Sequence, residues 1–399
     1  MCRRMTAGAR TRLTARHPGI MASLGVFLAA LCAFLAIGAA LPVLPAYVRG
    51  PLHSSDLAVG IVVGAFAITS VICRPLAGRQ ADIRGRRLVL IGGALAMAVG
   101  GLLYLVSDSV PTLVLARLVV GVGEGSLYTA GATWAVDLAP EDQRGLALGL
   151  FGLAVWGGLS IGPVTGELLR SHVGYNAVWI LTAALPALGA LIALRLPEPA
   201  RLVSGSEPGP LALFPRAAHR PGVALALANI GYAALAGFVI LALRARGIGG
   251  GATVFTVFAL AVFASRLVLS RVPDRAGARR TATAAGLIEA LGLAMIASAH
   301  SLGVALVGAL VVGVGFSMLF PSLALMVVGE VGEDRRGSAM GAFTAFFDIG
   351  VGLGGPIAGL TASLLGYPAV FYLSALAALG TAVLAAIPER APGTVPAAD

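Results

Sequence analysis

Hydrophobic positions along the chain fall into long runs separated by short polar segments. A membrane-spanning helix needs about 20 mainly apolar residues. Runs of that size occur in windows near residues 20–48, 57–77, 88–107, 111–138, 145–169 and 175–196, and again near 221–243, 252–271, 281–300, 302–329, 338–365 and 368–387. The pattern predicts an all-α membrane protein with a basic N-terminal segment (1–19), two six-helix bundles (20–196 and 221–387), a linker (197–220) and a tail (388–399).

Composition supports a membrane location. Hydrophobic residues make up 58% of the 399 residues and charged residues 12%, whereas about a quarter of the residues of a soluble domain are charged. All basic side chains are arginines, and the net charge of +10 arises from arginines in the short loops. The positive-inside rule explains this distribution, so we expect no nucleic-acid partner.

The arginines also predict the orientation of the chain. If the N-terminus is cytoplasmic, the loops on that side hold most of the arginines, and the other side holds only Arg49, Arg170, Arg244 and Arg246. We therefore expect a bacterial inner-membrane protein with both termini and the linker in the cytoplasm. Three further arginines lie inside or at the edge of predicted spans: Arg74, Arg117 and Arg266.

A shift of 192 residues brings three separate parts of the chain into register, which indicates an internal repeat. Residues 78–87 (GRQADIRGRR) fall on 270–279 (SRVPDRAGAR), and Arg74 falls on Arg266. The matched residues are Asp82 with Asp274, Gly85 with Gly277, Gly121 and Gly123 with Gly313 and Gly315, and Glu141, Asp142, Arg144, Gly145 and Gly149 with Glu333, Asp334, Arg336, Gly337 and Gly341.

Two six-span halves related as parallel repeats resemble the major facilitator superfamily. The segment 78–87 resembles the signature loop that follows the second helix in that family. The resemblance implies that Asp82 lies beside the N-terminus of the eleventh helix, where the helix dipole favours an anion. It implies gating roles for Gly78, Asp82, Arg84, Gly85, Arg86, Arg87, Asp274, Arg275 and Gly277. The alternative is that the basic loop is only an orientation signal.

The fifth span carries a second resemblance. Its glycines and proline resemble the motif of the drug:proton antiporter branch, namely Gly149, Gly158, Gly162, Pro163 and Gly166. The match ends at Glu167, where family members usually have another glycine. The resemblance implies exchange of substrate against protons. The alternative is structural, because glycine allows close helix packing and proline kinks a helix.

An ionisable group inside a membrane span is costly and therefore indicates a functional site. Glu124, Glu289 and Asp348 lie well inside spans. Glu124 belongs to a segment, Arg117 to Gly125, that resembles a family motif linked to proton coupling, and the resemblance places Arg117 and Glu124 in or near a central cavity. They lie seven residues and about 10 Å apart on one helix face, so a water or substrate group fits between them.

For Glu124 the sequence leaves two interpretations open. Burial opposes the charged form of a carboxylate, and a nearby cation favours it. Binding of a cationic substrate would thus release a proton, so we hypothesise that Glu124 alternates between proton and substrate. The alternative is a protonated Glu124 hydrogen-bonded to neighbouring backbone.

The remaining polar candidates are weaker. Asp348 takes up protons, binds substrate or bridges to another helix, and the sequence does not choose among these. For Glu289, on an outer helix, a structural role is favoured. The neutral candidates for the cavity are Tyr128, which lies one turn from Glu124, Asn229 and Tyr232.

The sequence therefore predicts a secondary transporter, most simply a proton-coupled exporter of a small amphipathic organic compound. The alternatives are a sugar or metabolite permease, by efflux or proton symport, and, more distantly, a membrane enzyme or a structural membrane protein. We expect no enzymatic activity, because no P-loop, HExxH or metal-spaced cluster occurs. The expected partners are a small-molecule substrate, protons and the lipid bilayer, with a monomeric chain, no metal and no cofactor beyond the proton gradient.

Overall fold

The computed structural model describes residues 17–140, 143–198, 216–331 and 336–388, and within these ranges the chain is helical. Twelve of the helices are long and apolar enough to cross a membrane, which confirms the predicted fold class. The helices are α2 (His17–Arg49), α3 (Asp56–Arg84), α4 (Arg86–Leu105), α5 (Val110–Asp137), α6 (Arg144–His172), α7 (Tyr175–Leu194), α8 (Arg216–Ala245), α9 (Gly251–Val268), α10 (Val272–Ala276), α11 (Ala278–Ala297), α12 (Leu302–Gly329), α13 (Arg336–Leu365) and α14 (Tyr367–Ala386).

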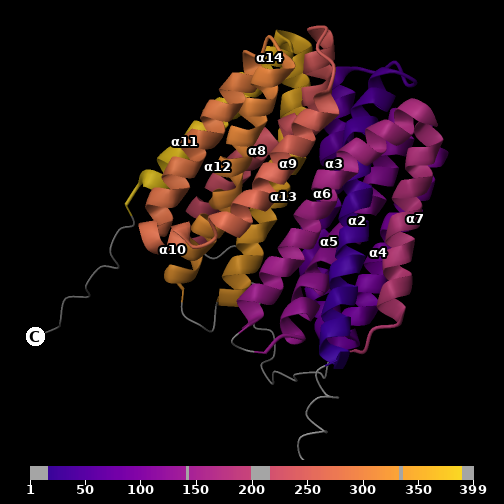
Figure 1. Cartoon of the computed structure of the whole chain (residues 1–399), viewed down its shortest axis with the longest axis vertical. Coiled ribbons are helices and arrows are strands. Elements are labelled where there is room, and N and C mark those ends of the chain that lie inside the picture. Colours follow the sequence, from indigo (N-terminus) through magenta and orange to yellow (C-terminus); the bar gives the residue numbers. More distant parts are fainter. Residues whose placement is uncertain (1–16, 141–142, 199–215, 332–335, 389–399) are drawn as a thin grey trace, which may run out of the picture.

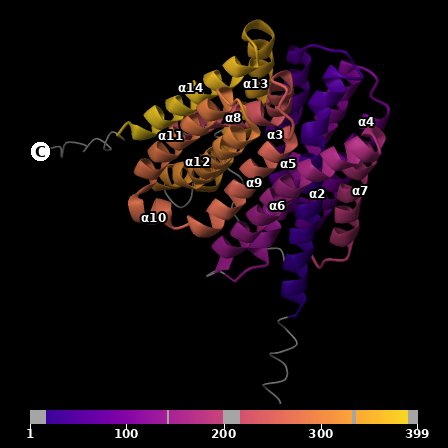
Figure 2. The same ribbon diagram turned by 45° about the horizontal axis from the view of Figure 1, so that its top comes forward.

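The helices gather into two bundles that lie side by side, α2–α7 and α8–α14 (Figures 1 and 2). We call the end of the molecule where α7 ends and α8 begins the linker face, and the end that carries residues 50–55 the opposite face. The predicted N-terminal segment, most of the linker and the tail lie largely outside the described residues.

Backbone geometry repeats between the two halves. Gly85 and Gly277, which lie 192 residues apart, have φ angles of 104° and 88°. Gly174 and Gly366, at the same separation, have φ angles of 107° and 82°. Each of these glycines stands directly before a helix, in a conformation that side-chain-bearing residues rarely adopt. The halves therefore share turns as well as sequence.

The segment after the second span differs from the prediction of a loop. Helix α3 continues to Arg84, so Gly78 and Asp82 lie in its last turns and Gly85 alone separates it from α4. Alanine, glutamine and arginine favour helix, which explains the continuation. In the second half Pro273 takes the position of Ala81. Proline is accommodated best in the first turn of a helix, and Pro273 stands in the first turn of the short α10, which is separate from α9.

The two halves pack closely along α3 and α13, toward the opposite face. A Cβ atom added to Gly60 would lie 2.1 Å from the Gly355 carbonyl oxygen, and one added to Gly64 would lie 2.7 Å from the Gly352 carbonyl oxygen. Small residues permit such backbone contact between membrane helices. This contact fixes α3 against α13, and both helices contribute to the site below.

Candidate functional site

A cavity lined by residues of both halves lies between them. The first, fourth, seventh and tenth spans (α2, α5, α8 and α12) line it, as the resemblance implied. Four further helices, α3, α6, α9 and α13, also line it, and three of these carry its remaining charged residues, Arg74, Arg266 and Asp348.

Arg74 of α3 joins the two halves within this cavity. Its Nε donates to Asp348 Oδ2 at 2.5 Å and its Nη2 donates to Asp348 Oδ1 at 3.1 Å, a two-pronged contact with α13. The same Nη2 donates to Glu124 of α5, 3.1 Å from Oε1 and 3.3 Å from Oε2. One guanidinium therefore pairs with a carboxylate from each half, in the geometry that arginine and carboxylate groups favour.

Two neighbours complete this group. Ser70, one turn before Arg74, donates to Glu124 Oε2 at 2.8 Å. The Tyr128 ring centroid lies 4.8 Å from the guanidinium carbon of Arg74, a cation–π contact. Asp348 is 1% exposed, Glu124 6% and Arg74 15%. We call Arg74, Glu124 and Asp348 the charge cluster.

The charge cluster contains two carboxylates for one guanidinium. Buried charges persist only where partners offset the cost of leaving water. One proton added to either carboxylate would leave a one-to-one ion pair. Arg74 would therefore keep one ionised partner if either carboxylate carried a proton, and only the Asp348 contact joins the two halves.

Arg266 of α9 is the second arginine of the cavity. Its guanidinium carbon lies 5.5 Å from the Trp156 ring centroid, across the boundary between the halves. Its Nε is buried without a hydrogen-bond partner among the described residues. The cavity around it is rich in aromatic rings, which include Trp156, Tyr232, Phe316 and Phe347.

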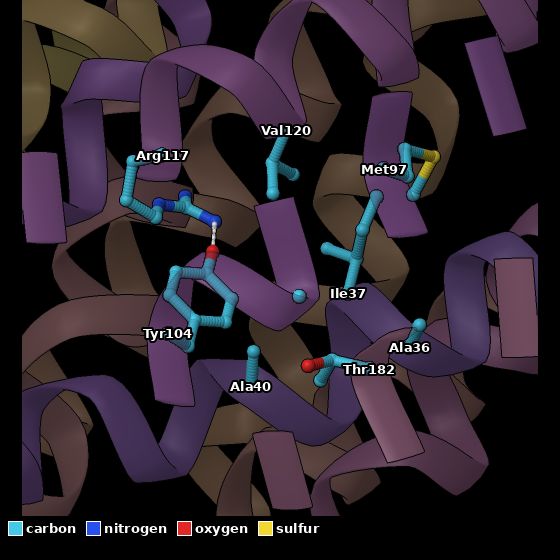
Figure 3. Close-up of a pocket in the computed structure, with 9 residues that line it drawn as sticks. Ala36, Ile37, Ala40, Met97, Tyr104, Arg117, Val120 and Thr182 are labelled. Atoms are coloured by element: carbon cyan, nitrogen blue, oxygen red, sulfur yellow. Dashed lines mark hydrogen bonds between the residues drawn. The ribbon is translucent and has the colours of Figure 1, made fainter. Parts of the chain in front are cut away.

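Arg117 does not share this cavity with Glu124, in contrast to the expectation from the sequence. It lines a separate, smaller pocket within the first half. Its Nε and Nη2 each donate at 3.0 Å to backbone carbonyls of α3, those of Val62 and Val63. Figure 3 shows its guanidinium facing the Tyr104 hydroxyl, 3.5 Å away. The side chain turns from α5 toward α3 because those carbonyls supply its acceptors.

Of the other predicted cavity residues, two line the cavity and one does not. Tyr128 and Tyr232 line the cavity. Asn229 instead lies buried where α8 packs on α13, and its Nδ2 donates to the Leu225 carbonyl at 2.8 Å. A Cβ atom added to Gly350 of α13 would lie 2.8 Å from the Asn229 Cβ. Asn229 is thus placed as a helix-packing residue.

The residues of the first half for which the resemblance implied gating roles form their own ion pairs. Arg86 contacts Asp82 at 2.6 Å and Asp137 of α5 at 3.0 Å. The Asp82 side chain is 69% exposed. The resemblance implied that it lies beside the N-terminus of α13, but within the described residues its ion-pair partner is Arg86. Arg87 donates to the carbonyl of Leu196, just beyond the end of α7. In the second half, Asp274 and Arg275 are exposed on α10.

Helix α6, whose glycines resemble the antiporter motif, packs three of them on α2. A Cβ atom added to Gly158, Gly162 or Gly166 would lie within 2.6 Å of the backbone of α2, whereas one added to Gly149 would meet nothing within 4 Å. Pro163 lies inside the helix. Glu167, at the departure from the family motif, contacts Arg170 at 2.7 Å and Arg244 of the other half at 3.2 Å.

Sequence reasoning missed Arg74 and Arg266 as cavity residues. The signal was present, because the repeat places one on the other and both fall at the edge of spans. Arginine at a span edge is also typical of an orientation signal, so position alone does not place it in a cavity. Glu289, by contrast, is fully buried on α11 away from the cavity lining, and neither of its carboxylate oxygens has a partner among the described residues.

Twelve apolar helices in two repeated bundles around a charged central cavity define a multi-pass membrane transporter. The family model of the Major Facilitator Superfamily matches residues 26–253 and 247–398, so the chain belongs to that family. It is similar to uncharacterised MFS-type transporters. One from Salmonella typhimurium is 37% identical over 360 residues, which cover 88% of this chain and 92% of the relative. One from Burkholderia mallei is 33% identical over 362 residues, which cover 89% of this chain and 88% of the relative.

Two solved structures share the fold. The human organic anion transporter MFSD10 (TETRAN) superposes with a TM-score of 0.70 at 20% identity and covers 93% of this chain and 100% of its own. A variant of the nucleoside transporter NupG superposes with a TM-score of 0.77 at 16% identity, and the match covers 90% of this chain and 98% of the NupG chain.

Proposed function

We propose that this chain is a proton-coupled secondary transporter of a small amphipathic organic compound, and that the charge cluster is its coupling site. The observation that carries the proposal is the bridge from Arg74 to both Glu124 and Asp348, one carboxylate in each half. In alternating access the two halves rock around a central site. A proton that changes the bridge therefore changes the relation between the halves.

The cycle begins with both carboxylates paired to Arg74, as described above. A proton that binds Asp348 weakens its charge-assisted hydrogen bonds with Arg74, because ionised partners bind roughly twice as strongly as neutral ones. Arg74 keeps Glu124 as its partner, so no charge is left unpaired at membrane depth. The two halves are then free to separate at the cluster.

Export in exchange for protons is the direction that the antiporter-type helix supports. Its glycines hold α6 against α2, and the resemblance implies that such a helix prevents leak. We propose that the linker face is cytoplasmic, in the inner membrane, because the positive-inside rule favours that orientation.

Cotransport of a proton with the solute is the second candidate, and the charge balance of the cavity favours it. The cavity contains two arginines and two carboxylates. Its net charge is zero when all four are ionised, and each added proton makes it more positive. A proton and an anionic solute would therefore bind together more readily than either alone.

The test uses purified protein in proteoliposomes with an imposed pH gradient and a fluorescent pH probe. Amphipathic compounds are added, and the wild type is compared with Glu124→Gln, Asp348→Asn and a matched control, Asp108→Asn, whose residue is exposed between α4 and α5. We expect compound-dependent proton movement in the wild type and the control and its loss in both cluster variants. The sign of the movement distinguishes exchange from cotransport.

Transport without proton movement would contradict the proposal. If a radiolabelled compound crosses the bilayer through the wild-type protein without proton movement, the protein is a uniporter or uses another ion. The proposed role of the charge cluster would then be wrong.

A further inference from the structure

Arg74 and Arg266 are repeat-related arginines with different surroundings. They lie 192 residues apart on α3 and α9, and both line the cavity. Arg74 pairs with two carboxylates. Arg266 has no ion pair among the described residues, and its Nε has no acceptor there. The difference raises the question of what normally satisfies Arg266.

The repeat explains why its acidic partners are missing. At the same separation of 192 residues, Glu124 corresponds to Phe316 and Asp348 corresponds to Trp156. Both aromatic residues line the cavity, and the Arg266 guanidinium carbon lies 5.5 Å from the Trp156 ring centroid. Aromatic rings therefore occupy the positions at which the other half carries carboxylates.

A cation–π contact satisfies such a guanidinium only in part. A ring face attracts the charge but accepts none of the N–H groups in the plane of the guanidinium. A positive charge at membrane depth is costly unless an anion or an acceptor accompanies it. Since the cavity is the solute's own site in the proposed function, the missing anion is a group that the solute brings.

We propose that Arg266 binds an anionic group of the transported solute, such as a carboxylate, sulfonate or phosphonate. This inference rests on the proposed function, because it assumes that the cavity is the transport site. It replaces the cationic substrate considered from the sequence, because both cavity carboxylates are already paired with Arg74. It concerns the solute and holds for exchange or cotransport.

The surrounding rings indicate the rest of the solute. Tyr232 and Phe316 are stacked with centroids 5.9 Å apart, and the Phe347 centroid lies 6.2 Å from that of Tyr232. The Trp156 centroid lies 5.7 Å from that of Phe316. Such rings favour a flat apolar body by offset or edge contacts. The solute class is therefore an amphipathic organic anion with an aromatic body.

The experiment measures equilibrium binding of tritiated probes to the purified full-length protein by scintillation proximity. The probes are matched sets on naphthalene and biphenyl bodies, each as the carboxylate, the sulfonate, the neutral amide and the cationic aminomethyl compound. The variants are Arg266→Gln, Arg266→Lys and a matched control, Arg271→Gln, whose arginine is exposed just beyond α9.

We expect the anions to bind the wild type more tightly than their neutral or cationic counterparts. Arg266→Gln should weaken anion binding by roughly 10- to 100-fold, the usual effect of losing a charged hydrogen-bond partner. Arg266→Lys should restore part of it, and Arg271→Gln should bind as the wild type does. Binding of the neutral amides should change little in any variant, which shows that the cavity remains folded.

Two results would overturn the inference. One is that no anion binds more tightly than its matched amide or amine, and the other is that Arg266→Gln leaves anion preference unchanged. Proton movement in proteoliposomes separates this inference from the proposed coupling. Anion binding that depends on Arg266, without any proton movement, would support this inference and contradict the proposed coupling. Proton movement that amines drive without dependence on Arg266 would support the coupling and contradict this inference.

Discussion

Arg74 and Asp348 lie 274 residues apart in the chain and form a two-pronged contact between the halves, with nitrogen–oxygen distances of 2.5 and 3.1 Å. The pair stands between the close glycine contacts of α3 with α13 and the linker face. Any rocking motion that separates α3 from α13 at this depth must lengthen it. The pair is therefore a structural tie between the halves, and it is the point at which the proposed coupling would act.

Removal of Arg74 should destabilise the protein strongly. Arg74→Gln leaves two buried carboxylates without their cation, and loss of one partner of a buried ion pair costs about 3–5 kcal/mol. The double variant Arg74→Gln with Asp348→Asn should recover part of that loss, because it removes one unpaired charge. Unfolding in detergent measures both effects, with the exposed Arg84→Gln as control. An Arg74→Gln protein as stable as the wild type would contradict the importance of the cluster.

The antiporter-type motif offers a comparison within one helix. In Gly162→Ala the new Cβ atom would lie 2.6 Å from the backbone of Gly38, so α6 must move away from α2. In Gly149→Ala it would meet nothing within 4 Å, and alanine favours helix by about 1 kcal/mol over glycine. We expect Gly162→Ala to lower thermal stability and transport rate and Gly149→Ala to preserve both. Equal effects would show that the motif acts through something other than packing.

The fold followed from the sequence because its signals are strong and repeated. Apolar runs of about 20 residues indicate membrane spans, and the repeat at a separation of 192 residues indicates two related halves. Span boundaries were less accurate where helix-favouring residues continue past the apolar run, as at Gly78–Arg84. A polar segment can remain helical outside the hydrophobic region, and hydropathy does not report that.

The charged cavity was predictable only in part. Glu124 and Asp348 stood out as carboxylates within spans, and both lie in the charge cluster. That Arg74 is their common partner was not predictable, because the sequence does not show which helices touch, within a half or between the halves. Arg117 shows the same limit, since the direction of its side chain toward the α3 carbonyls depends on how α5 packs on α3.

Glu167 should strengthen closure at the opposite face. It links α6 to α8 through Arg244, 3.2 Å away, and the Arg244 side chain is 46% exposed. Such a partly exposed pair is worth at most about 1 kcal/mol and weakens in high salt. Glu167→Ala should therefore raise the population open at that face by a factor of up to about 5.

Thiol labelling measures that population. Tyr232→Cys is introduced into a background in which Cys2, Cys32 and Cys73 are replaced, and a membrane-impermeant maleimide is added from the opposite face. We expect faster labelling with Glu167→Ala at low salt and a smaller difference at high salt, with Asp108→Asn as control. A labelling rate that Glu167→Ala leaves unchanged would show that this ion pair does not hold the face closed.

Glu289 provides a test of whether a buried carboxyl group must be functional. It is fully buried on α11, and both its oxygens lack partners among the described residues. Its repeat equivalent, Met97, is buried and apolar. A buried polar group without a hydrogen bond costs about 1–3 kcal/mol, and methionine is an adaptable side chain of similar length. If Glu289 is only a packing residue, Glu289→Met should raise stability by about that amount and leave transport in proteoliposomes the same as in the wild type. Reversible denaturation and the proteoliposome assay measure the two quantities on the same preparation, and loss of transport in a stabilised Glu289→Met protein would instead assign Glu289 a part in proton transfer.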